Sequence, residues 1–275
     1  MNCYKFNSFD GDLSSLVDGA NMFLATDLSS WDKDLSNLVY CPNMFAQTQL
    51  TSWRKPLTKL INGTGMFGET LLATFTGLLP ALVDGNHMFY DTSLTSFTSN
   101  LTSLVNGQSM FDGCYTLASF NALMKNLNNG ESMFLNANLT SFGSDLSSLV
   151  NGIEMFARNE NFKTFSSDLT SLKSGYYMFR NTKLDTNSIY KIATYINDIS
   201  SLDKNNDDDW KYVSSTSIQN DYSYPLFHYS SIASENRGVL HLDYDNSITD
   251  LTKINDSIKT IKEKGWTVYL RDVLQ

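Results

Sequence analysis

Apolar residues recur along the first two thirds of the chain with a nearly constant period. Adjacent Met-Phe pairs follow one another at steps of 22, 22, 22, 22, 23, 22 and 23 residues. A fixed period in this range is typical of a repeat solenoid, in which each repeat buries its apolar face against its neighbours. The eight pairs are Met22-Phe23, Met44-Phe45, Met66-Phe67, Met88-Phe89, Met110-Phe111, Met133-Phe134, Met155-Phe156 and Met178-Phe179.

Further positions recur inside each repeat and predict which side chains form the core. In one repeat Phe97 begins the pattern, and Leu101 and Leu104 follow at spacings of four and three residues. Gly107 then precedes the next Met-Phe pair, and only Cys41 interrupts this glycine column. Columns of like residues predict stacked coils around a shared apolar core. The aromatic column consists of Phe9, Trp31, Trp53, Phe75, Phe97, Phe120, Phe142 and Phe165.

The residue types between these columns predict the local structure of a coil. Ser/Thr-rich segments such as LTSF at 94–97 favour short strands that pair in parallel with the next coil. Asn-Gly or Asp-Gly before most Met-Phe pairs predicts a turn with positive φ. The segment that ends in Met-Phe is expected to form a short helix or a helical turn. The predicted fold class is therefore an α/β repeat, a solenoid of about eight coils over residues 1–183.

The two steps of 23 residues share one cause. Their extra residue falls just after a Met-Phe pair, in DGCYT at 112–116 and in ARNEN at 157–161. Insertions gathered at one corner mark a surface loop, and such loops often lie on the binding face of a solenoid. We therefore predict that Tyr115 and Arg158 contact a ligand.

A threonine recurs three residues after the Phe of five repeats. Its hydroxyl is expected to form a ladder that satisfies backbone groups, and a polyhydroxyl recognition strip is the alternative. The column consists of Thr26, Thr48, Thr70, Thr92 and Thr182.

The string MFDGCYTLASF and the frame around it resemble a known repeat family over residues 6–184. The frame runs from Met-Phe through Leu-Thr-Ser-Phe and Leu-Ser-Ser-Leu-Val-Asn-Gly to the next Met-Phe. It is similar to the BspA-type leucine-rich repeats and to the Mycoplasma-type lipoprotein repeats, which share a Met-Phe-x-x-Cys corner. Only Cys114 keeps that corner cysteine. The resemblance implies a right-handed, leucine-rich-repeat-like solenoid, found in surface proteins of bacteria and protozoa and in tail-associated proteins of gut bacteriophages.

After the last Met-Phe pair, residues 184–275 are predicted to form a C-terminal α/β capping region. Apolar residues at helical spacing predict helices over 186–202 and 248–264. Alternation predicts a strand over 238–245, and WTVYL at 266–270 is expected to be a final strand. This order resembles two larger leucine-rich units, and the ending KGWTVYL resembles the ends of phage repeat proteins.

An aromatic segment at 210–229 is predicted to be a long loop within this region. Aromatic rings in a polar loop suit glycan stacking or a protein interface. Packing of the loop onto the cap is the alternative. The candidate binding residues here are Trp210, Tyr212, Tyr222, Tyr224, Phe227 and Tyr229.

The N-terminal end shows no matching cap, because only MNCYK precedes Phe6 and Phe9, which already occupy repeat columns. An open solenoid end exposes apolar groups and strand edges that proteins usually cover. We expect this end to pack on another chain, a second copy or a further domain. A degenerate cap formed by residues 1–5 is the alternative.

Composition narrows the partners. The net charge is −9, with 29 acidic and 20 basic residues, and no basic cluster suits nucleic-acid phosphates. No stretch approaches the roughly 18 apolar residues of a membrane span. The first residues show no signal peptide, so the chain is expected to be soluble and not exported by the usual route.

Few residues suggest chemistry. Three scattered cysteines, Cys3, Cys41 and Cys114, form neither a disulfide framework nor a zinc site and are expected to be free, inert thiols. The acidic run at 203–209 begins like an EF-hand loop. It then has Asp208 in place of glycine and Ser214 in place of the bidentate glutamate, which favours a solvated loop.

We find no catalytic motif, no metal site and no cofactor site in the sequence, and the three histidines are expected to be satisfied or superficial. The favoured function is non-enzymatic binding, adhesion or assembly. We expect a tail-associated protein of a bacteriophage virion that engages a host-surface or virion partner. The alternative is a bacterial cell-surface adhesin whose leader and anchor lie outside this chain. A glycan-active enzyme is the least favoured hypothesis, because no carboxylate pair is placed by a motif.

Overall fold

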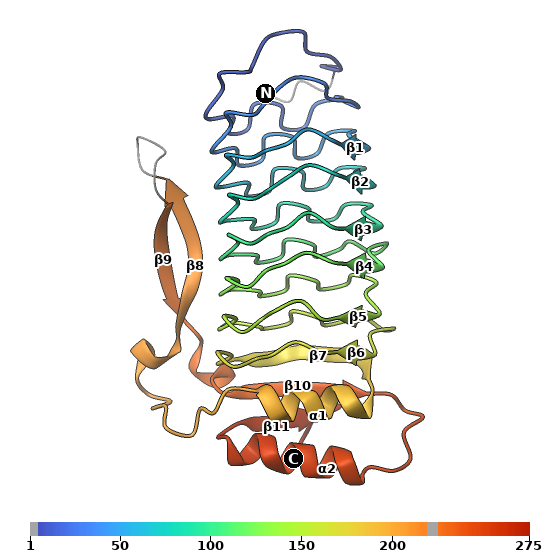
Figure 1. The fold of residues 1–275 in the computed structure, drawn as a ribbon, viewed down its shortest axis with the longest axis vertical. Coiled ribbons are helices and arrows are strands. Elements are labelled where there is room, and N and C mark those ends of the chain that lie inside the picture. The colour runs from blue at the N-terminus through green and yellow to red at the C-terminus, as the bar shows by residue number, and fades with distance from the viewer. Residues whose placement is uncertain (1–4, 219–224) are drawn as a thin grey trace.

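The computed structural model describes residues 5–218 and 225–275 and shows a stack of coils closed at its C-terminal end by a cap (Figure 1). The repeat solenoid is thus confirmed. Each coil is joined to the next by a parallel bridge between residues that lie directly before the glycine column. These bridging residues are Asp18, Tyr40, Asn62, Asp84, Asn106, Asn129, Asn151 and Ser174.

The predicted apolar columns form one continuous core. From the second pair onward, every Met-Phe pair is buried completely. Phe111 stacks on Phe134 of the next coil, with ring centroids 5.5 Å apart and planes 3° apart. The same ring meets Phe97 of the aromatic column edge-on at 4.9 Å. Two columns of interlocked rings therefore run through the coils in geometries that aromatic pairs prefer.

The predicted strands form, but each is only two residues long. The first residue of each strand is exposed and the second is buried, which places the aromatic column in the core. The strands pair in parallel as β1–β2, β3–β4 and β5–β6. They are β1 (Ser52–Trp53), β2 (Thr74–Phe75), β3 (Ser96–Phe97), β4 (Ser119–Phe120), β5 (Ser141–Phe142) and β6 (Thr164–Phe165).

The Met-Phe segments form turns, and the expectation of a short helix there is wrong. Alternate N–H groups reach across to the next coil: Gly85 donates to Asn106 and Phe89 to Met110, both at 2.9 Å. These N–H groups are therefore unavailable for an α-helix, which would need them bonded back along the chain. Non-glycine residues in left-handed conformation flank the pairs, as His87 (φ 53°) and Asp91 (φ 51°) do.

The glycine column is explained by close packing and not by the predicted positive φ. The left-handed residues lie two positions later, for example Gly65 after Gly63. A Cβ atom at Gly85 would lie 2.9 Å from the Sδ atom of Met110, and the other glycines from Gly19 to Gly152 meet the next methionine similarly, whereas Gly175 meets Leu240 of the cap. The methionine of each coil thus rests on the glycine of the coil before it.

The threonine column satisfies backbone groups, as predicted. Each hydroxyl donates to the carbonyl of the Phe three residues earlier, at 2.8 Å from Thr70 to Phe67. The other members do the same at 2.8–3.0 Å. All five side chains are buried, so they offer no recognition strip.

The cap continues the coils with a mixed sheet covered by two helices. Its strands are ordered β12-β11-β10-β7, and β10 runs parallel to both β7 and β11. The two helices and two strands predicted for this region all form, and both helices are shorter than predicted. The elements are β7 (Gly175–Leu184), α1 (Thr186–Tyr195), β10 (Val239–Tyr244), α2 (Thr252–Glu263), β11 (Thr267–Leu270) and β12 (Val273–Leu274).

The aromatic segment is a β-hairpin, not the predicted loop. After the 3₁₀ turn η1 (Asp207–Trp210), strand β8 (Lys211–Ile218) pairs antiparallel with β9 (Pro225–Ser231). The hairpin lies alongside the coils (Figure 1). A second 3₁₀ turn, η2 (Ser234–Asn236), leads from it back to β10.

A stack of rings crosses three strands of the cap. His241 on β10 lies 4.4 Å from the ring of Tyr177 on β7 and 4.5 Å from the parallel ring of Tyr269 on β11. The N–H of Tyr177 donates to His241 Nδ1 at 3.0 Å, so this nitrogen carries no proton. Burial lowers the pKa of His241 to about 4, opposed by the charge of Asp272 and assisted by that of Arg180.

We predict that replacing Thr70 by Val lowers the free energy of unfolding by about 1–3 kcal/mol, because the buried Phe67 carbonyl loses its donor. Urea unfolding should show this shift. The matched control is Thr58→Val at an exposed position, which should change the midpoint little. Equal shifts in the two variants would contradict the assigned role of the hydroxyl.

We also predict an acid sensitivity from His241. Its folded pKa of about 4 lies below the ordinary 6.5, so the unfolded chain takes up this proton first as pH falls. The contribution of His241 to stability is therefore complete above pH 6.5 and declines towards pH 4, by about 3 kcal/mol at most. Urea unfolding of wild type and His241→Gln should be measured between pH 6.5 and pH 4. The free energy of unfolding of His241→Gln should fall less than that of the wild type; identical pH profiles would exclude a contribution from His241.

Candidate binding groove at the insertion corner

The two insertions shape a recess between them. Tyr115 comes from the first insertion, and Glu160 and Asn161 from the second. The coil that lies between these two has no insertion, and it contributes Asn136, Ala137 and Asn138 to the floor. A hollow of about 370 Å³ results, lined by Tyr115, Asn136, Ala137, Asn138, Arg158, Glu160, Asn161 and Asn181. The structure thus brings together Tyr115 and Arg158, both predicted from the slip in the period.

A second hollow continues the first towards the cap. Its volume is about 430 Å³, and it shares Glu160 and Asn181 with the first hollow. We call the two together the corner groove. The remaining lining residues are Thr182, Lys183, Asp243, Tyr244, Asn246 and Arg271.

The backbone of the groove is held by the coil-to-coil ladder. Asn136, Arg158 and Asn181 all lie in the left-handed region, with φ of 54°, 61° and 58°. The N–H of Asn136 donates to Ala157, and that of Arg158 donates to Arg180 at 2.8 Å. Side chains along the groove are therefore carried by a backbone that neighbouring coils hold in place, which lowers the ordering cost of binding.

The groove mixes both charge signs on an acidic protein. Its lining includes the cationic side chains of Arg158, Lys183 and Arg271 and the anionic side chains of Glu160 and Asp243. Burial raises the pKa of Asp243. The N–H of Asn181, which donates to Asp243 Oδ2 at 2.7 Å, partly offsets this increase. This arrangement favours a ligand that presents both donors and acceptors over a simple ion.

Several polar groups of the groove are available to a ligand. Among residues 5–218 and 225–275, the side chains of Asn138, Arg158, Glu160 and Asn161 form no hydrogen bond or ion pair with another protein group. The ring of Tyr115 is 66% exposed at one side of the recess. The lining contains no Ser, Cys or His, and its described residues supply amides, charges of both signs, one threonine and aromatic surface.

The hairpin aromatics predicted as binding residues lie in different environments. Trp210 is fully buried and donates from Nε1 to the carbonyl of Asp203, so its ring has no surface for a ligand. Tyr212 is half-buried, whereas Phe227 and Tyr229 are 40% and 61% exposed. Tyr222 and Tyr224 lie outside the described residues. Trp210, Tyr212, Phe227 and Tyr229 do not line the corner groove.

A ladder of amides along the coils holds the hairpin in place. Asn106, Asn129 and Asn151 each donate to the side chain of the previous rung, at 3.0, 3.0 and 3.1 Å. At the N-terminal side of this ladder, Asp84 is almost completely buried. Burial raises the pKa of Asp84, and several hydrogen bonds to its carboxylate lower it in part. Two of these come from Thr216 of β8, whose N–H and hydroxyl both donate at 2.9 Å to Asp84 Oδ2.

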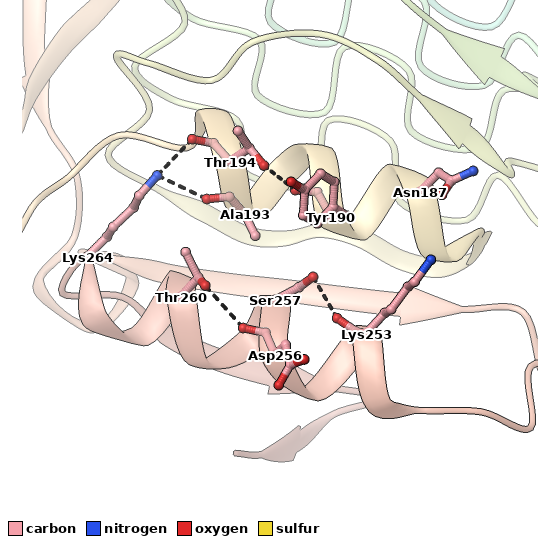
Figure 2. A pocket seen from close by; sticks show the side chains of 9 residues that line it. All are labelled: Asn187, Tyr190, Ala193, Thr194, Lys253, Asp256, Ser257, Thr260 and Lys264. Atoms are coloured by element: carbon pink, nitrogen blue, oxygen red, sulfur yellow. Dashed lines mark hydrogen bonds between the residues drawn. The ribbon is translucent and has the colours of Figure 1, made fainter.

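A further hollow of about 640 Å³ lies between α1 and α2 (Figure 2). Four of the eight polar side chains that line it, those of Thr194, Ser257, Thr260 and Lys264, donate to main-chain carbonyls. The Lys264 ammonium donates to the carbonyls of Ala193, Thr194 and Ile196, which end α1. Thr260 donates back to a carbonyl of its own helix. We therefore interpret this hollow as the seam between two packed helices.

Three further features of the described residues concern metal sites, reactive cysteines and membrane-spanning helices. In the described part of the chain no group of His, Cys, Asp and Glu side chains could hold a metal ion. Cys41 and Cys114 are free and buried, and burial raises the pKa of Cys114 to about 11. Cys3 lies outside the described residues. None of the described helices is long and apolar enough to cross a membrane.

Comparison of the chain with models of protein families, with curated proteins and with solved structures finds no significant match in any of the three.

We predict that Asp84→Ala loosens the hairpin without unfolding the coils. Thr216 loses the acceptor for both its N–H and its hydroxyl. Amide hydrogen exchange at Thr216 should then accelerate by roughly tenfold or more, about 1.4 kcal/mol of local stability. Asp145→Ala, which removes an exposed carboxylate that caps a turn, is the matched control. Unchanged exchange at Thr216 would exclude Asp84 as the anchor.

Proposed function

We propose that this chain is a non-enzymatic binding module built on a leucine-rich-repeat-type solenoid. The observation that supports this most directly is the corner groove. Two insertions, two coils apart, leave a recess in which the side chains of Asn138, Arg158, Glu160 and Asn161 have no protein partner among the described residues. In a solenoid, extended surfaces of this kind commonly serve recognition.

A glycan is the ligand class that suits the groove best. Asn138, Asn161 and Arg158 offer donors, Glu160 offers acceptors, and the exposed Tyr115 ring can pack on the apolar face of a sugar. A protein loop with comparable polar groups is the second candidate. The solenoid itself would serve as a rigid carrier of this surface.

The narrower proposal is that the chain belongs to a bacteriophage virion as a tail-associated protein. It rests on the resemblance of the Met-Phe frame to repeats of such proteins. A bacterial cell-surface adhesin is the alternative, and the N-terminal coil is a candidate contact for another chain or domain. Genes for capsid or tail proteins beside this one, and its peptides in purified particles, would support the virion. An upstream leader would favour the adhesin.

We predict that glycan binding depends on both insertions. A glycan array should first identify a bound oligosaccharide, and calorimetry should then show affinity reduced roughly tenfold or more by Tyr115→Ala and by Arg158→Ala. Neither change should alter thermal unfolding by more than a small amount, because both side chains line an open groove.

Tyr190→Ala is the matched control, since this tyrosine is 63% exposed but lies on α1. Equal losses in Tyr190→Ala and Tyr115→Ala would exclude the corner groove as the binding site. Release of reducing sugar from the bound glycan would overturn the assignment of a non-enzymatic function.

A further inference from the structure

Strand β9 presents an unpaired edge. Among the described strands it pairs only with β8. The other side of β8 faces the coils, where Asn128 accepts from the N–H of Val213 at 2.8 Å and Asp84 accepts from that of Thr216. Strand β9 therefore lies on the side of β8 away from the coils (Figure 1).

The hydrogen bonds of β8 reveal which groups of β9 point outward. Val213 is opposite Tyr229, and Thr216 is opposite Phe227. Since Val213 and Thr216 direct their N–H groups to the coils, each belongs to a pair that exchanges no hydrogen bonds inside the hairpin. The N–H and C=O groups of Phe227 and Tyr229 therefore point to the free edge.

Apart from Pro225 at its first position and a register shift in β8 between Val213 and Ser215, nothing in the described residues of the hairpin protects this edge. The sequence of β9, PLFHYSS, carries no Lys, Asp or Glu, and Leu226, Phe227 and Tyr229 are 43%, 40% and 61% exposed. Natural edge strands are usually blunted by charges, bulges or a covering element. An isolated two-stranded hairpin also gains stability when further strands join it.

We propose that β9 pairs antiparallel with β9 of a second copy of this chain, about a two-fold axis at His228. The strand is self-complementary in this register. Phe227 falls opposite the partner's Tyr229, and Tyr229 falls opposite the partner's Phe227. These are the residues whose backbone groups point outward, so each pair exchanges both of its hydrogen bonds.

Side chains support the same register. Phe227 and Tyr229 are two residues apart and share one face, so both aromatic cross-strand pairs form on that face of the new sheet. A slip by one residue would place Phe227 and Tyr229 opposite other residues of the partner strand, and both aromatic pairs would be lost. The result is a four-stranded sheet between two solenoids. Its interface is small, so we expect a weak dimer that depends on concentration.

Sedimentation equilibrium of the full chain over a wide range of concentration tests the dimer. His228→Lys places like charges directly opposite each other at the axis and should raise the dissociation constant at least roughly tenfold. Ser215→Lys is the control, because Ser215 lies opposite His228 in the hairpin but one strand farther from the partner. Its dissociation constant should stay within about twofold of the wild-type value.

A cross-linking experiment tests the register. With Cys3 replaced by Ser, His228→Cys should form an intermolecular disulfide on mild oxidation, since the two Cα atoms face each other in a pair without hydrogen bonds. Ser230→Cys should not, because its two copies lie too far apart along the strands. A wild-type chain that stays monomeric, or equal cross-linking of both variants, would overturn the proposal. Binding of an unrelated extended peptide to such a monomer would assign the edge to a different partner.

Discussion

The contact between the methionine of one coil and the glycine of the coil before it sets the geometry of the whole solenoid. Met110 Sδ lies so near Gly85 that a Cβ atom there would approach it to 2.9 Å. At the same place alternate N–H groups donate to carbonyls of the next coil. Both interactions require successive coils to stay in register, so extra residues can enter only where the chain leaves this ladder. Each insertion extends past the last ladder donor of its Met-Phe segment, Gly113 or Arg158, and the groove between the insertions is a consequence of that constraint.

The insertions also show how the core tolerates a longer coil. Asn159 replaces the usual threonine, and its Nδ2 group donates to the carbonyls of Phe134 and Phe156 at 2.7 and 3.0 Å. Its Oδ1 atom accepts from the N–H of Leu139. One amide thus satisfies three main-chain groups from two successive coils, while Glu160 and Asn161 line the groove. The core remains closed and only the surface changes.

The sequence predicts the core well because each column is repeated eight times, whereas single features depend on contacts that no local pattern shows. The Asn-Gly and Asp-Gly pairs predict positive φ at the glycines, but in the structure the glycines must be small because the methionines pack on them. The hairpin was missed because KYVSSTSI has a weak pattern and is anchored by residues 85 and 132 positions away, at Asn128 and Asp84. The period predicts Tyr115 and Arg158 as ligand contacts, and both line the corner groove. Asp243 and Arg271 could be placed beside them only once the cap was folded.

The buried amide ladder explains why a hairpin is needed on that side of the molecule. Asn and Asp side chains at successive rungs satisfy one another along the stack, but each rung still has polar atoms facing outward. Strand β8 supplies partners for them: the carbonyl of Ser214 accepts from Asn106, and that of Thr216 accepts from Asn62. Covering these polar groups uses one edge of β8 and moves the unpaired edge to β9. The ladder therefore determines both where the hairpin lies and which of its edges is unpaired among the described strands.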